Sequence, residues 1–159
     1  MADKLLATYL NDHLGGATGG LELARRAAGS NEGNDYGVKL AGLAREIEGE
    51  REDLLRLMAS LGIGTDRIKV AGGWVGEKLG RLKPNGALLS YSPLSRLIEI
   101  EGLYLGVTGK LSLWTNLEAS HGPTVGGVDV VGLADQARAQ QAMLDELRRS
   151  AATEALGSS

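Results

Sequence analysis

Residues 34–62 read NDYGVKLAGLAREIEGEREDLLRLMASLG, and this stretch predicts a long amphipathic helix. Its large apolar residues recur at alternating intervals of three and four positions: Leu40, Leu43, Ile47, Leu54, Leu57 and Leu61. Such spacing places them on one face of a helix, and that face is buried when helices pack together. The series is interrupted once, at Glu50, where the spacing would place another leucine.

Residues 92–119 read SPLSRLIEIEGLYLGVTGKLSLWTNLEA and predict a second helix of this kind. Ser92 followed by Pro93 is a strong helix start, because serine caps the helix and proline suits its first position. The apolar series is again interrupted by a carboxylate, Glu101, and otherwise runs through Leu94, Leu97 or Ile98, Leu105, Thr108 and Leu111. We therefore expect Glu50 and Glu101 to face the interior, where a carboxylate is costly unless it is paired, protonated or metal-bound.

The rest of the chain predicts an all-α protein. Further helical periodicity covers about residues 3–28, 66–83 and 129–156, and no stretch shows the sustained alternation typical of strands. Short connections make neighbouring helices antiparallel. We expect one domain, residues 1–156, forming an up-down helical bundle of four long helices plus one shorter helix (66–83), with 157–159 as a disordered tail.

The composition narrows the class of protein. The 159 residues carry a net charge of −3 and are 43% hydrophobic, as in ordinary globular domains. This mild acidity argues against nucleic acid as a partner. Cysteine is absent, which excludes disulfides and thiolate chemistry. No secretory leader or membrane-spanning stretch is recognisable, so we expect a cytoplasmic location.

Residues 66–83 combine an apolar face with five basic residues, Arg67, Lys69, Lys78, Arg81 and Lys83. A basic amphipathic helix can lie on a membrane surface or meet an acidic partner. The favoured interpretation is an ordinary core helix with a solvated basic face, so a membrane surface is not the expected partner. A protein partner or self-association is compatible with the whole composition.

Several glycines fall inside the predicted helices at intervals of four, including Gly16 with Gly20 and Gly102 with Gly106. Each costs about 1 kcal/mol relative to alanine in a helix interior. The favoured interpretation is close approach of neighbouring helices. The alternative is that Gly102 and Gly106, beside Glu101, leave room for a ligand within the bundle.

Carboxylates at mid-height in a helical bundle are the ligands of di-iron and di-manganese sites. The candidate metal ligands in this chain are Glu22, Glu50, Asp53 and Glu101. The full di-metal motif also has two Glu-x-x-His pairs, and we expect neither His13, near the start of its helix, nor His121, just before Gly122 and Pro123, to occupy a ligand position. We favour structural pairing of the carboxylates with arginines, and an iron or manganese site is the alternative. The arginines in reach are Arg25, Arg26, Arg45, Arg51 and Arg96.

Four short motifs resemble an uncharacterised bacterial family of actinobacterial type: YLNDHL (9–14), LELARR (21–26), EKLGRLK (77–83) and YSPLSR (91–96). The resemblance covers most of the chain and implies no activity. The layout of two long helical hairpins joined by a longer crossing resembles the ferritin-like superfamily. We expect a non-enzymatic cytoplasmic bundle acting through interaction or as a scaffold. The alternative is a ferritin-like carboxylate-bridged metalloprotein, an oxidoreductase or a metal store.

Overall fold

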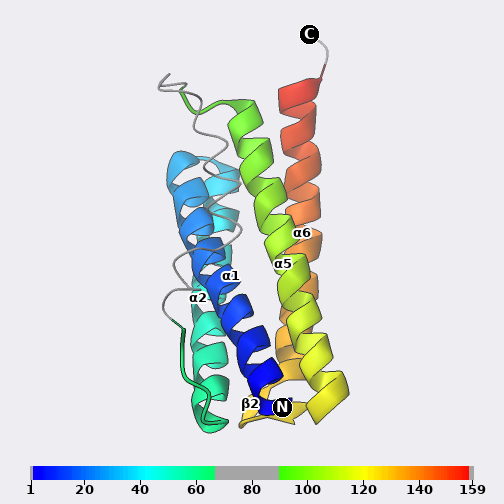
Figure 1. Ribbon diagram of the computed structural model, residues 1–159. Coiled ribbons are helices and arrows are strands. Elements are labelled where there is room, and N and C mark those ends of the chain that lie inside the picture. Colours follow the sequence, from blue (N-terminus) through cyan, green and yellow to red (C-terminus); the bar gives the residue numbers. More distant parts are fainter. Residues whose placement is uncertain (1, 67–89, 158–159) are drawn as a thin grey trace.

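The computed structural model describes residues 2–66 and 90–157, and most of these residues lie in α-helices (Figure 1). The described helices are α1 (Ala2–Ser30), α2 (Asp35–Ser60), α5 (Pro93–His121) and α6 (Val130–Leu156). The prediction of a mainly helical protein is confirmed, and each of these helices begins and ends within two residues of its predicted range. The shorter helix predicted at 66–83 lies outside the described residues, apart from residue 66.

Local side-chain hydrogen bonds explain where three of the helices begin. The Asn34 side chain accepts from the Gly37 amide at 3.1 Å and caps α2. Ser92 accepts from the Ser95 amide at 3.1 Å and forms a reciprocal capping box at the start of α5. Asp129 caps α6 by accepting from the amide of Gly132 at 3.0 Å. These contacts span only three residues, so the sequence specifies them without help from the rest of the fold.

A small β-hairpin joins α5 to α6, so the prediction of no sheet is wrong at this point. Strands β1 (Thr124–Val125) and β2 (Val128–Asp129) pair in antiparallel fashion. Gly126 and Gly127 form the turn with φ angles of +56° and +79°. Positive φ at both central residues is the geometry that matches strand twist and favours glycine. Two-residue strands are too short to show alternation, which is why the pattern gave no sign of them.

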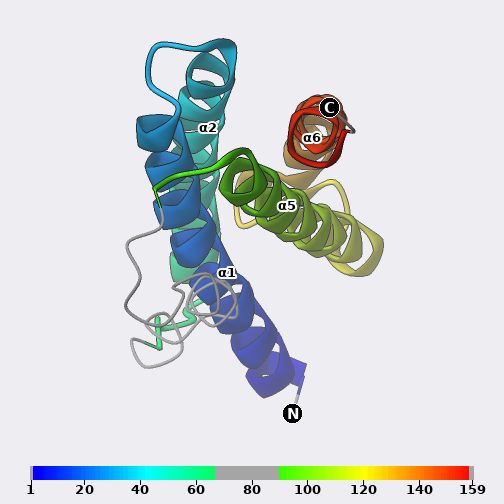
Figure 2. The ribbon, with the colours of Figure 1, turned by 90° about the horizontal axis from the view of Figure 1, so that it is seen from above.

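The helices form two hairpins, α1 with α2 and α5 with α6, which pack together mainly through α1 and α5 (Figures 1 and 2). The start of α5 lies near the end of α1, because the Asn31 side chain donates to the Tyr91 hydroxyl at 2.8 Å. The chain after α2 lies beside the first half of α1, where Asn11 donates to the Gly64 carbonyl at 3.0 Å. Helices α2 and α5 therefore run in the same direction.

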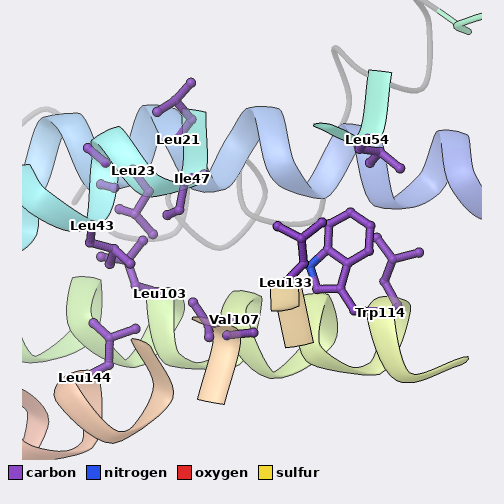
Figure 3. Close-up of a cluster of buried hydrophobic side chains, with 14 of the residues drawn as sticks. Leu21, Leu23, Leu43, Ile47, Leu54, Leu103, Val107, Trp114, Leu133 and Leu144 are labelled. Carbon is purple, nitrogen blue, oxygen red and sulfur yellow. The ribbon is translucent and has the colours of Figure 1, made fainter. Parts of the chain in front are cut away.

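One apolar core lies between the two hairpins, and all four helices contribute to it (Figure 3). Each buried leucine contributes about 1.5–3 kcal/mol relative to an exposed one. Within the described ranges, no helix is long and apolar enough to cross a membrane. The largest fully buried side chains are Trp114, Leu10, Leu14, Leu23, Leu40, Leu43, Leu54, Leu57, Met58, Ile100, Leu113 and Leu117.

Candidate functional site

Glu50 is buried in the middle of α2, as the helical spacing predicts. The residue is 3% exposed and shares the inner face of α2 with Ile47 and Leu54. A carboxylate in this position loses its hydration on folding, so it requires compensating partners. Its surroundings therefore define the first candidate site.

Glu101 is exposed, so the prediction that it faces the interior is wrong. The buried glutamate of α5 is Glu99, which is 3% exposed. Leu94 and Leu105, assigned to the inner face from the sequence, are 49% and 45% exposed. Because α5 carries apolar residues on several sides, its spacing fits more than one inner face, and only packing against α1 and α6 selects among them. The selected face contains Leu97, Ile100, Leu103, Val107, Trp114 and Leu117.

The partner of Glu50 is Lys110 of α5, so the expected pairing with an arginine is wrong. The Lys110 ammonium forms an ion pair with Glu50 Oε2 and also donates to Gln140 Oε1 of α6. The Gln140 amide in turn donates to Glu50 Oε1 at 2.8 Å and to Glu46 Oε2 at 2.8 Å. Three helices are thus linked through one polar network in the core.

Burial acts against the charge on both members of this pair. It raises the pKa of Glu50, and the attraction of Lys110 opposes that shift. Burial likewise lowers the pKa of Lys110, and the attraction of Glu50 opposes it. In each case the loss of hydration is the larger effect. The charged forms therefore depend on their mutual contact, and neither group is free to act alone.

The sequence pattern did not lead us to expect buried roles for Lys110 and Gln140, although the spacing contains a signal for each. Lys110 lies three residues after the buried Val107 and four before the buried Trp114. Gln140 has the same relation to two buried residues of α6, Ala137 and Leu144. Each is therefore a polar residue in an apolar series, as Glu50 is. The signal in α5 becomes visible only after its inner face is assigned correctly.

The four candidate metal ligands do not come together around Glu50. Glu22 and Glu101 are exposed, on α1 and α5 respectively. Asp53 is partly buried and forms an ion pair with Arg56 one helical turn away. Across residues 2–66 and 90–157, no three acidic or histidine side chains are grouped closely enough to hold a metal ion.

Arginines do pair with glutamates elsewhere in the bundle. Arg26 of α1 lies 3.6 Å from the buried Glu99 carboxylate, measured from Nε to Oε2. Burial raises the pKa of Glu99, and the attraction of Arg26 opposes the rise. Arg25 forms a solvent-exposed pair with Glu48 at 2.6 Å. The arginine-pairing interpretation therefore describes a real feature of the bundle, but it applies to Glu99 rather than to Glu50 or Glu101.

A cavity of about 360 Å³ lies next to the network, between α1, α2 and α5. Glu50 and Lys110 form part of its wall, and the rest is lined mainly by aliphatic side chains and Trp114. Its volume lies within the range of small-molecule sites. Exposed and buried residues both line it, so the cavity reaches the protein surface. Five glycines also line it: Gly16 and Gly20 of α1 and Gly102, Gly106 and Gly109 of α5.

These glycines differ in the space around them. A Cβ atom added at Gly102 would lie 3.3 Å from Leu23 Cδ2, so close helix packing explains this glycine. At Gly16, Gly20 and Gly106, an added Cβ would meet no atom within 4 Å in the described part of the chain. Close packing between the described helices therefore does not explain these three positions, where α1, α2 and α5 leave open space.

A second polar network ties the end of α1 to the start of α5. Asn31 is 1% exposed, and its side chain donates to Tyr91 and accepts from Arg96 Nε at 2.6 Å. Arg96 also pairs with Glu154 of α6 at 2.6 Å and lies over the Tyr36 ring, 4.5 Å from its centroid. Asn31 and Arg96 each contact side chains from other elements of the fold, which indicates a structural role.

The fold and the site together define a helical bundle that holds a buried lysine–glutamate pair beside an apolar cavity. Comparison of the chain with protein-family models, with curated proteins and with solved structures finds no match. Interpretation of the site therefore rests on its own geometry and chemistry.

Proposed function

We propose that this chain is a non-enzymatic, cytoplasmic helical-bundle protein that acts by binding another molecule, through interaction or as a scaffold. The observation that carries the proposal is the ion pair between the Lys110 ammonium group and the Glu50 carboxylate. A lysine in this position supplies the positive charge that a metal ion would otherwise supply to a buried carboxylate. A buried carboxylate of the bundle is thereby held in a structural pair.

The chemistry of the cavity also supports binding over acid–base catalysis. Glu50 and Lys110 neutralise each other, and their remaining polar atoms contact Gln140. Burial lowers the pKa of His13, which also lines the cavity, and thereby favours the neutral imidazole. A general acid or base needs a group poised to exchange a proton with a substrate. Neither Glu50 nor Lys110 is arranged in that way, and the His13 ring packs against Tyr9.

The runner-up is a ferritin-like carboxylate-bridged metalloprotein holding iron or manganese. The parallel direction of α2 and α5 supports a ferritin-like layout, because such bundles contain one long crossover connection. The shorter helix at 66–83 remains a prediction within that layout. Metal binding would require Glu50 to exchange Lys110 for the ion, and Glu22 and Glu101 to turn inward from the surface. A protein partner or a second copy fits the proposed function better than nucleic acid or a membrane surface.

Metal analysis tests the proposal directly. Protein purified without chelator should contain far less than one iron or manganese ion per chain, and added Mn²⁺ or Fe²⁺ should leave its Tm unchanged. A bound ion would instead stabilise the fold by about 2.7 kcal/mol at a hundredfold excess over its Kd.

A matched pair of variants makes the result specific. Stoichiometric metal, with a Tm increase that is lost in Glu50→Gln but retained in Glu52→Gln, would establish the metalloprotein. Glu52 is a suitable control because it is exposed on the same helix, two residues from Glu50.

A further inference from the structure

The cavity is kept open at a cost in helix stability. Gly16 and Gly20 on α1, together with Gly106 and Gly109 on α5, line it within helices. Each glycine costs about 1 kcal/mol relative to alanine there. At all four positions an added Cβ would meet no described atom within 4 Å, so steric conflict does not require glycine. Side chains at these positions would instead narrow the open space between α1 and α5.

One cation lining this space lacks an acidic partner among the described residues. Arg51 of α2 is partly buried, and its Nε donates to Thr18 Oγ1 at 2.9 Å. Lys110, the other cation in the wall, is already paired with Glu50. A guanidinium group binds a carboxylate through two parallel hydrogen bonds, and it keeps its charge at any physiological pH.

The charges that the described residues place in the wall match a singly charged anion. The Glu50–Lys110 pair in the wall is neutral overall, so Arg51 is the only cation without an acidic partner that the described residues place there. A single carboxylate matches the one guanidinium. The aliphatic lining and Trp114 match an apolar body.

We propose that the cavity between α1, α2 and α5 binds a small amphiphilic monocarboxylate, with its apolar body against the glycine-lined walls and its carboxylate at Arg51. This inference rests on the proposed function, since it names the class of molecule that the bundle binds. It also explains why glycine, rather than alanine, occupies the open positions of α1 and α5.

Isothermal titration calorimetry with decanoate tests the inference, with 1-decanol as a neutral probe of the same chain length. The wild type should bind both and prefer decanoate. Arg51→Gln should weaken decanoate binding about tenfold or more, because a hydrogen-bonded charge is lost, and should leave 1-decanol binding unchanged. Equal effects on the two probes, or no effect on either, would overturn the assignment of the carboxylate to Arg51.

A second experiment fills the cavity with larger side chains and measures binding of the same two probes. The double variant Gly20→Leu/Gly106→Leu should lose binding of both probes, and the milder Gly20→Ala/Gly106→Ala should weaken it. The Tm of the alanine variant should rise, which separates loss of the cavity from loss of the fold. Gly49→Leu is the matched control, because Gly49 is exposed on α2, its added Cβ meets no described atom within 4 Å, and it does not line the cavity.

Two outcomes would overturn the inference: a folded wild type that binds neither probe, and binding that survives in a folded Gly20→Leu/Gly106→Leu variant. Either result leaves the proposed non-enzymatic function standing, because metal analysis tests that function separately. Stoichiometric metal, in contrast, would contradict the proposed function whatever the two probes do.

Discussion

Lys110 of α5 and Glu50 of α2 form an ion pair inside the bundle, with side chains only 13% and 3% exposed. Gln140 of α6 contacts both members of the pair. Burial opposes the charge on each group, so the pair contributes little net stability compared with apolar side chains of the same size. It does require α2, α5 and α6 to meet in one register, because any shift would leave a charge unpaired.

A double-mutant cycle tests this account of the pair. Lys110→Met leaves the Glu50 carboxylate buried without its cation, and Glu50→Leu leaves the ammonium without its anion. Each should lower the free energy of unfolding by about 3–5 kcal/mol. The double variant should be more stable than either single variant, as measured by urea denaturation. Additive losses would show that the two groups do not interact.

The pH dependence of stability tests the environment of Glu99. Because burial raises its pKa, the folded protein holds the Glu99 proton more tightly than the unfolded chain does. The stability from this group is therefore greatest at low pH and is lost as pH rises from the ordinary value of 4.5 through the higher folded-state pKa.

Urea unfolding between about pH 4 and pH 7 should show this loss in the wild type, and Glu99→Gln should lose less stability over the same range. Glu101→Gln is the matched control, since Glu101 is exposed two residues away, and it should behave as the wild type. An identical pH dependence in all three proteins would show that Glu99 titrates normally.

The same substitution at two helical glycines should have opposite effects. At Gly20 an added Cβ meets no described atom within 4 Å, so Gly20→Ala should raise the free energy of unfolding by about 0.5–1 kcal/mol. At Gly37 the Cβ would lie 2.1 Å from the backbone oxygen of Asn31. Gly37→Ala should therefore lower stability by about 1–3 kcal/mol, through displacement of the α1–α2 turn. Thermal unfolding of the two variants measures both changes in stability. Changes of the same sign would contradict this account.

The network at the end of α1 should depend on its buried amide. Asn31→Ala removes the acceptor of Arg96 and a donor to Tyr91, and should cost about 1–3 kcal/mol because buried polar groups lose their partners. Glu154→Ala removes the other partner of Arg96, but the Glu154 side chain is 46% exposed. Its loss should cost at most about 1 kcal/mol. Equal losses of stability in the two variants, measured by denaturant titration, would contradict a central role for Asn31 in this network.

The helical class of the protein and the ends of its described helices were predictable because their determinants are local. Ser92 caps a helix with Ser95, and Asn34 does so with Gly37, three residues away in each case. The burial of Glu50 was also predictable, since α2 has one well-defined apolar face. The hairpin at 124–129 escaped prediction because its strands are too short to form a pattern.

Spacing along the chain determined that α2 would bury a carboxylate, because a helix fixes which residues share a face. It did not determine which glutamate of α5 would be buried, because apolar residues surround much of that helix and α1 and α6 select its inner face. Nor did it determine that Lys110 would reach Glu50 across 60 positions of sequence, or that Gly16 and Gly106 would border open space. These features depend on the distance between helices, which is a property of the assembled bundle.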